Sequence, residues 1–252
     1  MANQQEKVYI YGRHALMEAL IHRPHAVKKA FLDASIQDPE LKGAIRKAGA
    51  TMGTLSEKAL RGVGARATHQ GIIGVLSLGG LILSYKQFVN KLSVNEDTAL
   101  ILLDEIQDPH NVGAIIRSAA AFGISGVLIP EHNQAPVTGA VVKVSAGTVF
   151  QIPLVSIGNV NETVRDLKKN GFWIYGLEAG GTHSLPDERF DSPAVFILGN
   201  ESEGIRQKTR ELCDILLSIP MNPKCESLNV AAGAAVGLYA WSIQHVKALK
   251  KI

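Results

Sequence analysis

Two polar side chains, Asn111 and Arg117, lie in a segment that otherwise carries small and apolar residues, DPHNVGAIIRS. Arg117 is the one charged residue between Val112 and Phe122, a stretch with helical spacing. We expect Asn111 to cap this helix. A helix without other charges is expected to be mostly buried, where an unpaired guanidinium is very costly. Arg117 therefore needs an anionic partner, either a carboxylate of the protein or a bound phosphate.

A second polar segment, LGNESEGI, follows directly after the apolar run at 194–198. Gly199 permits close backbone approach or a positive φ at the end of a strand. Glu201 is the nearest plausible counter-charge for Arg117. The alternative is a simple turn with an exposed glutamate.

A third segment carries Ser227 and Asn229 at the start of an uncharged stretch. From Ser227 to Val246 there are 20 residues without Asp, Glu, Lys or Arg. A helix of this composition must be buried within its own subunit, against another subunit, or both. Ser227 and Asn229 either cap this helix or contribute to a site.

Apolar runs that alternate with helical patterns must position these three segments. The strands are expected at 99–103, 126–129, 153–157, 172–177, 194–198 and 214–219, and the helices at 112–122, 137–146, 160–170 and 228–247. Strands that are apolar throughout indicate an α/β fold with a mostly parallel sheet, covered on both faces. Ligands of such sheets bind at the carboxyl ends of the strands.

The first third of the chain reads as a separate, small α/β unit, with a helix at 13–22 and strands at 27–32 and 72–78. We expect three parts: a domain at 1–78, a linker at 79–96 and a second domain at 97–252. Residues 1–80 have 11 basic and 6 acidic residues, a net charge of +5, whereas the remainder has a net charge of −2. This asymmetry indicates either an anionic partner for the first domain or a merely lysine-rich surface.

Composition excludes several classes of protein and of site. Hydrophobic residues make up 46% of the 252 residues and charged residues 19%, as in globular proteins. Cys213 and Cys225 form no zinc pattern. Neither a secretory signal nor a membrane span is visible, so the cytosol is the expected compartment. The glycine motif at 62–67 lacks the strand context of a dinucleotide site, and no phosphate-binding lysine loop, nucleophile elbow or zinc-protease motif is found.

The three polar segments, DPHNVGAIIRS, ILGNESEGIR and IPMNPKCESLNVAAGAA, resemble in order and spacing the three motifs of the SpoU (TrmH-type) RNA ribose 2′-O-methyltransferases. The resemblance covers residues 97–247. APVTGAVVKVSAGTVFQIPL looks like the bacterial 23S rRNA guanosine-2′-O-methyltransferase branch. VYIYGRHALMEAL and ATHQGIIGVL look like the small substrate-binding domain of that branch.

The resemblance implies a C-terminal trefoil knot of the SPOUT type, S-adenosyl-L-methionine as cofactor and a homodimer formed through the C-terminal domain. It implies an rRNA substrate, docked by a small α/β RNA-binding domain in which we select Arg13 and Arg66 as RNA contacts. No metal is needed, because the sulfonium of the cofactor loses its charge in the transfer. The implied catalytic residues are Asn111, Arg117, Glu201, Ser227 and Asn229, and the implied cofactor-binding residues are Leu177, Leu198, Gly199, Asn200, Ile219, Met221 and Leu228.

Within this family Arg117 is proposed to activate the ribose hydroxyl. A guanidinium is effectively always protonated, so we favour a grip on the adjacent phosphate with stabilisation of the developing alkoxide over a general base. We expect Glu201 to orient Arg117. One departure is Ser202, where the family motif has glycine; a positive φ there would strain it.

Two other functions remain open. The first is a tRNA 2′-O-methyltransferase, against which the extra N-terminal domain argues. The second is a non-catalytic RNA-binding factor in ribosome assembly, against which retention of all five polar residues argues.

Overall fold

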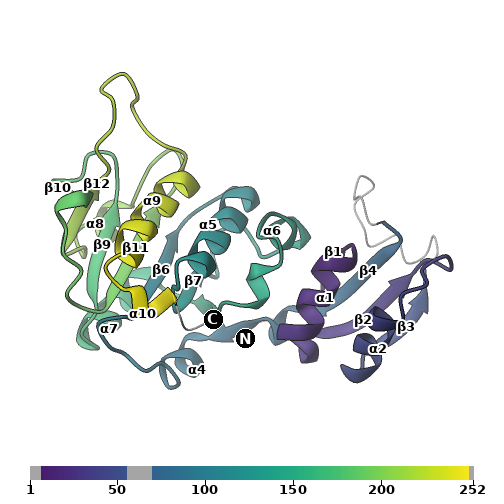
Figure 1. Ribbon diagram of the computed structural model, residues 1–252. Helices are drawn as coiled ribbons and strands as arrows, with labels where there is room; N and C mark the ends of the chain where they lie inside the picture. The colour runs from purple at the N-terminus through teal and green to yellow at the C-terminus, as the bar shows by residue number, and fades with distance from the viewer. Residues whose placement is uncertain (1–6, 56–69, 250–252) are drawn as a thin grey trace.

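The computed structural model describes residues 7–55 and 70–249 and contains two sheets, each with its own helices (Figure 1). The smaller sheet has four strands in the order β1-β4-β2-β3, in which β2 pairs parallel with β3 and antiparallel with β4. Leu16 and Leu20 of its first helix and Leu41 and Ile45 of its second are buried in the core. The elements are β1 (Lys7–Tyr11), α1 (Arg13–His22), the 3-10 turn η1 (Pro24–Ala26), β2 (Val27–Leu32), α2 (Pro39–Lys47), β3 (Thr51–Thr54) and β4 (Ile72–Ser77).

The larger sheet is parallel at every strand pair and has the order β10-β12-β9-β11-β6-β7-β8-β5. This is the mostly parallel α/β fold that the apolar runs predict. Its strands are β5 (Ile82–Ser84), β6 (Ala99–Asp104), β7 (Gly126–Pro130), β8 (Leu154–Ile157), β9 (Trp173–Leu177), β10 (His183–Ser184), β11 (Ala194–Gly199) and β12 (Ile215–Ser218).

The central strands of the larger sheet, such as β6 and β11, are apolar over most of their length because both faces are covered. On β6, Ala99, Ile101 and Leu103 belong to one hydrophobic cluster, and Leu100 and Leu102 belong to another. This alternation is the two-residue period of a strand between two cores. The helices on the first face are α5 (Pro109–Ala121), α6 (Gly139–Val144), α9 (Val230–Ser242) and α10 (Val246–Leu249), and on the second α4 (Tyr85–Val89), α7 (Val160–Lys169) and α8 (Gln207–Arg210), with 3-10 turns at η2 (Leu78–Gly80), η3 (Thr148–Phe150) and η4 (Leu185–Asp187).

The expected linker, residues 79–96, has regular structure and adds a strand to the larger sheet. It contains β5, which pairs parallel with β8, and α4, whose Phe88 is buried in the second cluster. The expectation of a plain linker is therefore corrected for this segment. Edge pairing over three residues stabilises β5, and a run this short has no visible sequence period.

Two helices differ from their predicted limits. Helix α5 begins at Pro109, with Asp108 as its N-cap, so Asn111 lies inside the helix and does not cap it. Proline at the first helical position after an aspartate is a common helix start. The predicted C-terminal helix is divided into α9 and α10. Between them, buried His245 stacks on Trp241 and has its ring nitrogens 3.1 Å from Asp97 Oδ1 and 2.9 Å from Phe190 O.

The two units contact each other through α1 and the segment after α6. His14 Nε2 donates to Ala146 O at 3.2 Å, and Gln151 Nε2 donates to Glu18 Oε2 at 2.8 Å. A Cβ at Gly139 would lie 2.2 Å from Tyr9 O, so only glycine allows this close approach of β1 to α6. The first domain is thus held against α6 and the segment after it.

Candidate functional site

The polar segments meet where parallel strands end. Strands β6, β9, β11 and β12 are neighbours in the sheet and run in the same direction. Their following loops therefore lie at one edge, where ligands of open α/β sheets bind. The loop between β12 and α9 extends beyond this edge, at the top of Figure 1.

A cavity of about 560 Å³ lies at this edge, a volume typical of sites for small molecules. Its walls are leucine and isoleucine side chains together with the backbone of the loop after β11, and Glu178 adds a carboxylate at its margin. All the residues predicted to hold the cofactor line this one cavity: Leu177, Leu198, Gly199, Asn200, Ile219, Met221 and Leu228.

The cavity wall at Gly199 has no room for a side chain. A Cβ at this position would lie 2.2 Å from the backbone carbon of Gly204 and the nitrogen of Ile205. The loop returns tightly on itself here, because Asn200 and Gly204 exchange both backbone hydrogen bonds at 2.9 Å. The expectation of close backbone approach at Gly199 is confirmed.

Three of the five predicted catalytic residues form one hydrogen-bonded cluster. Asn111 Nδ2 donates to Glu201 Oε1 at 2.8 Å, and Asn229 Nδ2 donates to Asn111 Oδ1 at 2.9 Å. Asn229 also caps α9, since its Oδ1 accepts from the backbone N–H groups of Ala231 and Ala232. The capping and cluster roles of Asn229 therefore coexist. The cluster joins the loops after β6, β11 and β12.

Glu201 receives backbone donors as well as Asn111. The N–H groups of Gln107 and Asp108 each donate to its carboxylate at 3.2 Å. Burial of Glu201 acts to raise its pKa, but the hydrogen bonds from Asn111 and from backbone N–H groups outweigh it and leave the pKa below its ordinary value. The carboxylate is therefore charged at neutral pH and holds the loop after β11 against the start of α5.

Arg117 is exposed, and the expectation that it is buried is wrong. It lies on the stripe of α5 that also carries exposed His110 and Ala121, while Asn111, Ile115 and Ala119 face the core. Among the residues that the structure describes, no carboxylate lies within ion-pair distance of Arg117, so the expected pair with Glu201 is absent. Glu201 instead satisfies nearby N–H donors, and Arg117 remains available to an external anion.

Neither Ser227 nor Ser202 has a positive φ. Ser227 is exposed at the cavity margin, beside Leu228. Ser202 has no positive φ; within its loop that conformation belongs to Gly204, at φ 72°. The Ser202 N–H donates to Asn200 Oδ1 at 2.9 Å, so the departure from the glycine motif causes no backbone strain.

The two predicted RNA contacts have different outcomes. Arg13 begins α1 as expected, and it forms ion pairs with Asp38, at 2.6 Å, and with Glu40. The hydrogen bonds to Asp38 and Glu40 raise the pKa of Arg13, and the bond to Asp38 has the larger effect. Its charge is thus compensated within the protein. Arg66, like the glycine motif at 62–67, lies outside the described residues.

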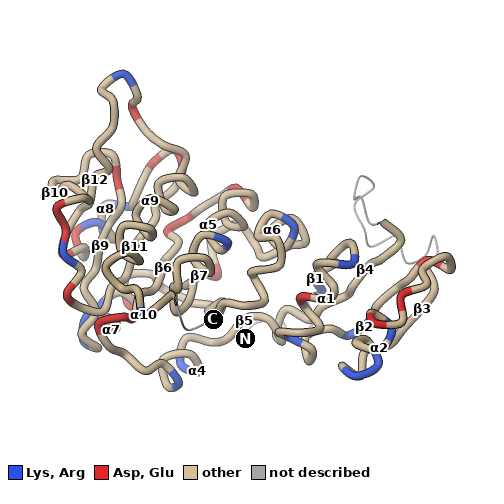
Figure 2. Tube along the Cα trace, in the orientation of Figure 1, with Lys and Arg blue, Asp and Glu red and all other residues tan. Residues whose placement is uncertain are grey.

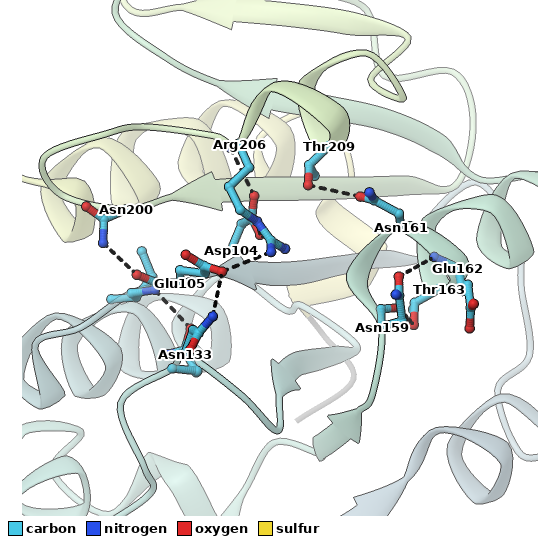
Figure 3. A network of polar contacts seen from close by, with 12 residues as sticks. Asp104, Glu105, Asn133, Asn159, Asn161, Glu162, Thr163, Asn200, Arg206 and Thr209 are labelled. Atoms are coloured by element: carbon cyan, nitrogen blue, oxygen red, sulfur yellow. Dashed lines mark hydrogen bonds and ion pairs between the residues drawn. The ribbon is translucent and has the colours of Figure 1, made fainter.

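Sequence reasoning missed an ion-pair network at the end of β6 (Figure 3). Arg206, at the end of the loop after β11, contacts both Asp104 and Glu105 at the end of β6. The signal was present, because two adjacent acidic residues directly after a buried strand are unusual.

Two kinds of feature are absent from residues 7–55 and 70–249, which the structure describes. No group of three or more His, Cys, Asp or Glu side chains is arranged to hold a metal ion. No helix in these residues is long and apolar enough to cross a membrane.

Family models match both units. The SpoU rRNA methylase family matches residues 98–239, and the RNA 2′-O ribose methyltransferase substrate-binding domain matches residues 9–78. The chain is 34% identical over 239 residues to the 23S rRNA (guanosine-2′-O-)-methyltransferase RlmB of Xanthomonas campestris, covering 93% of this chain and 96% of that one. It is 32% identical to RlmB of Neisseria meningitidis, with 100% of each chain covered.

A solved structure has the same fold. The SpoU methyltransferase AviRb from Streptomyces viridochromogenes, in complex with the cofactor AdoMet, superposes with a TM-score of 0.81 at 25% identity, covering 95% of this chain and 91% of that one. The match in sequence extends over both units and over every segment that lines the cavity. This chain belongs to the SpoU rRNA methylase family.

Proposed function

We propose that this protein transfers a methyl group from S-adenosyl-L-methionine to a ribose 2′-hydroxyl of RNA, and that its target is a guanosine of 23S rRNA. One observation carries the proposal: a small-molecule cavity adjoins the hydrogen-bonded cluster of Asn111, Glu201 and Asn229. The curated relatives, matched over nearly their whole length, have the same activity in their names. An rRNA substrate assigns the reaction to the cytosol.

The cavity fits the proposed cofactor in size and lining. Its volume of about 560 Å³ suits a ligand of this size, and Leu177, Leu198 and Ile219 provide apolar walls. Gly199 lets the backbone of residues 204 and 205 pack against the end of β11, which shapes this wall of the cavity. When bound, S-adenosyl-L-methionine supplies an electrophilic methyl group on a positively charged sulfur.

The protein's own contribution is to position the nucleophile and to stabilise charge. Arg117 is exposed and has no acidic partner among residues 7–55 and 70–249, so its guanidinium binds the phosphate beside the target ribose and stabilises the charge that develops on the 2′ oxygen. Ser227, at the cavity margin, orients the ribose. Asn111, Glu201 and Asn229 fix the three loops relative to one another. Glu201 therefore acts on the loops and not on Arg117.

The chain is divided into a substrate domain, residues 1–78, a connecting segment, 79–96, and a methyltransferase domain, 97–252. Two observations support an RNA-docking role for the first part. Residues 9–78 match the substrate-binding domain family, and residues 1–80 have a net charge of +5. The strand β5 extends the larger sheet into the connecting segment.

The second domain contains a trefoil knot at the edge that carries the cavity. Close packing of the segments that would form it supports this proposal. A Cβ at Gly181 would lie 2.5 Å from the backbone carbon of Leu217, and one at Gly237 would lie 2.8 Å from Leu177 Cδ2. The chain after β9 thus packs directly against β12, and α9 packs directly against the end of β9.

The active form is a homodimer built on α9. Four apolar side chains of α9 and the residues after it, each between 41% and 55% exposed, follow a helical spacing: Val236, Tyr239, Ile243 and Val246. Figure 2 shows α9 without a charged residue. An apolar stripe of this kind is typical of an interface.

Sedimentation tests the dimer. A Tyr239→Asp substitution should dissociate it at micromolar concentration, because it introduces a desolvated carboxylate into the interface. The control is Ile21→Asp on α1, at a similarly exposed apolar residue, which should leave the dimer intact. A wild-type monomer would contradict the assignment.

Methylation assays test the function and its alternatives. The protein is incubated with methyl-labelled cofactor and either deproteinised 23S rRNA or total tRNA, and 2′-O-methylated nucleotides are mapped. Label at a guanosine of 23S rRNA is expected. Label in tRNA alone would favour the tRNA enzyme. Binding of rRNA without transfer would favour a non-catalytic assembly factor.

A further inference from the structure

Arg206 joins the loop after β11 to the end of β6 through several bonds to two carboxylates (Figure 3). Its Nε donates to Asp104 Oδ1 at 2.9 Å, its Nη2 lies 2.6 Å from the same oxygen, and its backbone N–H donates to Asp104 Oδ2 at 3.2 Å. Its Nη1 donates to Glu105 Oε1 at 2.9 Å. The Asp104 side chain is fully buried, so Arg206 supplies the charge and the donors that this carboxylate needs.

Glu105 has a backbone conformation that non-glycine residues rarely adopt. Its φ is 67°, a left-handed conformation that a non-glycine residue keeps only where its surroundings hold it. Three contacts hold it here: Arg206 and Asn133 donate to its carboxylate, and Asn200 Nδ2 donates to its backbone carbonyl at 2.8 Å. This conformation is found at the point where the chain leaves β6 for the segment 106–108.

The loop between Asn200 and Arg206 is therefore fixed at both ends. At its start, Asn200 bonds to Glu105 O, and its own Oδ1 accepts from the N–H groups of Ser202 and Glu203. At its end, Arg206 is bound to Asp104. Glu201 lies between these two anchors, and its carboxylate accepts from the N–H groups of Gln107 and Asp108. Both sides of this contact belong to segments that Arg206 connects.

We infer that Arg206 is a positioning residue, which sets the placement of Glu201 against residues 107–108 and Asn111 by clamping Asp104 and Glu105. The inference rests on the proposed function for its effect on methyl transfer. The planar guanidinium spans two carboxylates at once, a geometry that a lysine ammonium cannot reproduce. Arg206 itself does not line the cavity, so it acts through the loop and not through a contact with cofactor.

The test compares Arg206→Ala and Arg206→Lys with wild type by two measurements. Amide hydrogen exchange of Gln107 and Asp108 reports on the Glu201 contact without requiring activity. Steady-state kinetics at saturating cofactor separate kcat from the KM for RNA. The lysine variant retains a charge beside Asp104, so it still tests the inference if the alanine variant fails to fold. The matched control is Lys168→Ala, which removes a 2.7 Å ion pair with Asp214, at a side chain 35% exposed against 42% for Arg206.

In Arg206→Ala we expect exchange at residues 107–108 to accelerate by about tenfold or more, as a local opening becomes easier. We expect kcat to fall by roughly tenfold with the RNA KM changed by less than about twofold, since ground-state binding is untouched. Arg206→Lys should fall between alanine and wild type, and Lys168→Ala should resemble wild type in both measurements.

A double-mutant cycle gives the decisive comparison. If Arg206 acts through Glu201, Arg206→Ala should lower kcat no further in a Glu201→Gln background. Unchanged exchange at residues 107–108 in both Arg206 variants, or full additivity in the cycle, would overturn the inference. A wild-type protein without transferase activity would overturn the proposed function instead, and the exchange measurement would still decide the positioning role.

Discussion

The two ends of helix α5 present opposite situations. At Asn111, near the start of the helix, the side-chain amide donates to Glu201 and accepts from Asn229, and Glu201 has two further backbone donors. Six residues later, Arg117 extends from the same helix with no acidic partner among the described residues. The hydrogen-bonding groups of Asn111 are already paired within the protein, whereas the positive charge of Arg117 is not paired with a carboxylate of the described residues.

This difference separates two kinds of contribution to a site. Groups that are bonded in advance hold loops in place and need little reorganisation during the reaction. A free, exposed guanidinium gains its partner only from an external anion, and a phosphate of RNA offers the bidentate geometry that arginine prefers. The same reasoning ranks Arg13 below Arg117 as an RNA contact, because Asp38 and Glu40 already compensate Arg13.

The largest effect is expected from Gly199→Ala, which disrupts the loop that carries Glu201 to Asn111. The new Cβ would lie 2.2 Å from the backbone of residues 204 and 205, so the turn between Asn200 and Gly204 must open. Cofactor affinity should fall by about 100-fold or more, roughly 2.7 kcal/mol, measured by calorimetry. The control is Gly158→Ala, where nothing lies within 4 Å of the added carbon. Wild-type affinity in Gly199→Ala would show that the loop is not a rigid wall of the cavity.

A smaller effect is expected from Glu201→Gln, which replaces one acceptor oxygen by an amide that faces N–H donors. We expect kcat to fall by about tenfold, or ~1.4 kcal/mol. The pKa of Glu201 is lowered in the folded state. Its contribution to stability is therefore present above the usual glutamate pKa of about 4.3 and is lost as the pH falls through the lowered value.

Unfolding by urea from about pH 7 to pH 3 measures this contribution. The stability advantage of wild type over Glu201→Gln should be constant at neutral pH and shrink on the acid side. An advantage that instead grew as the pH fell would mean that the folded protein favours the protonated carboxyl.

The smallest effect is expected from Arg13→Ala. Because two carboxylates already occupy this guanidinium, RNA affinity should fall by less than about threefold and the salt slope should change by less than about one. Filter binding over a range of salt concentrations measures both. A loss of tenfold or more would mean that Arg13 exchanges its internal partners for phosphate, and the contrast with Arg117 would then fail.

Most of the fold could be predicted because its signals are local. The limits predicted for α1 and β2, 13–22 and 27–32, agree with the structure, since apolar spacing changes abruptly at each end. The strand β5 and the helices α4 and α8 could not be predicted. They have three to five residues, and edge pairing and packing against distant residues stabilise them.

The sequence predicted which residues line the cavity but not which residues bond to one another beside it. The residues predicted to bind the cofactor were chosen from motifs, and they line one cavity. The partner of Glu201 was assigned by charge alone, to Arg117. The structure uses backbone N–H groups and Asn111, and such donors leave no trace in a sequence because every residue but proline has one. The exposure of Arg117 depends on how α5 is rotated against the sheet, which its uncharged neighbours do not reveal.

We propose that separate groups of this protein bind the cofactor and activate the ribose, namely the cavity and Arg117. The most direct test measures cofactor affinity and methyl transfer in Arg117→Ala, with Arg117→Lys as a charge-retaining comparison. We predict wild-type affinity by calorimetry in both variants, and kcat/KM on 23S rRNA reduced by about 100-fold or more in the alanine variant, ~2.7 kcal/mol of transition-state stabilisation. Retention of more than about a tenth of wild-type kcat/KM, a loss below ~1.4 kcal/mol, would contradict the account.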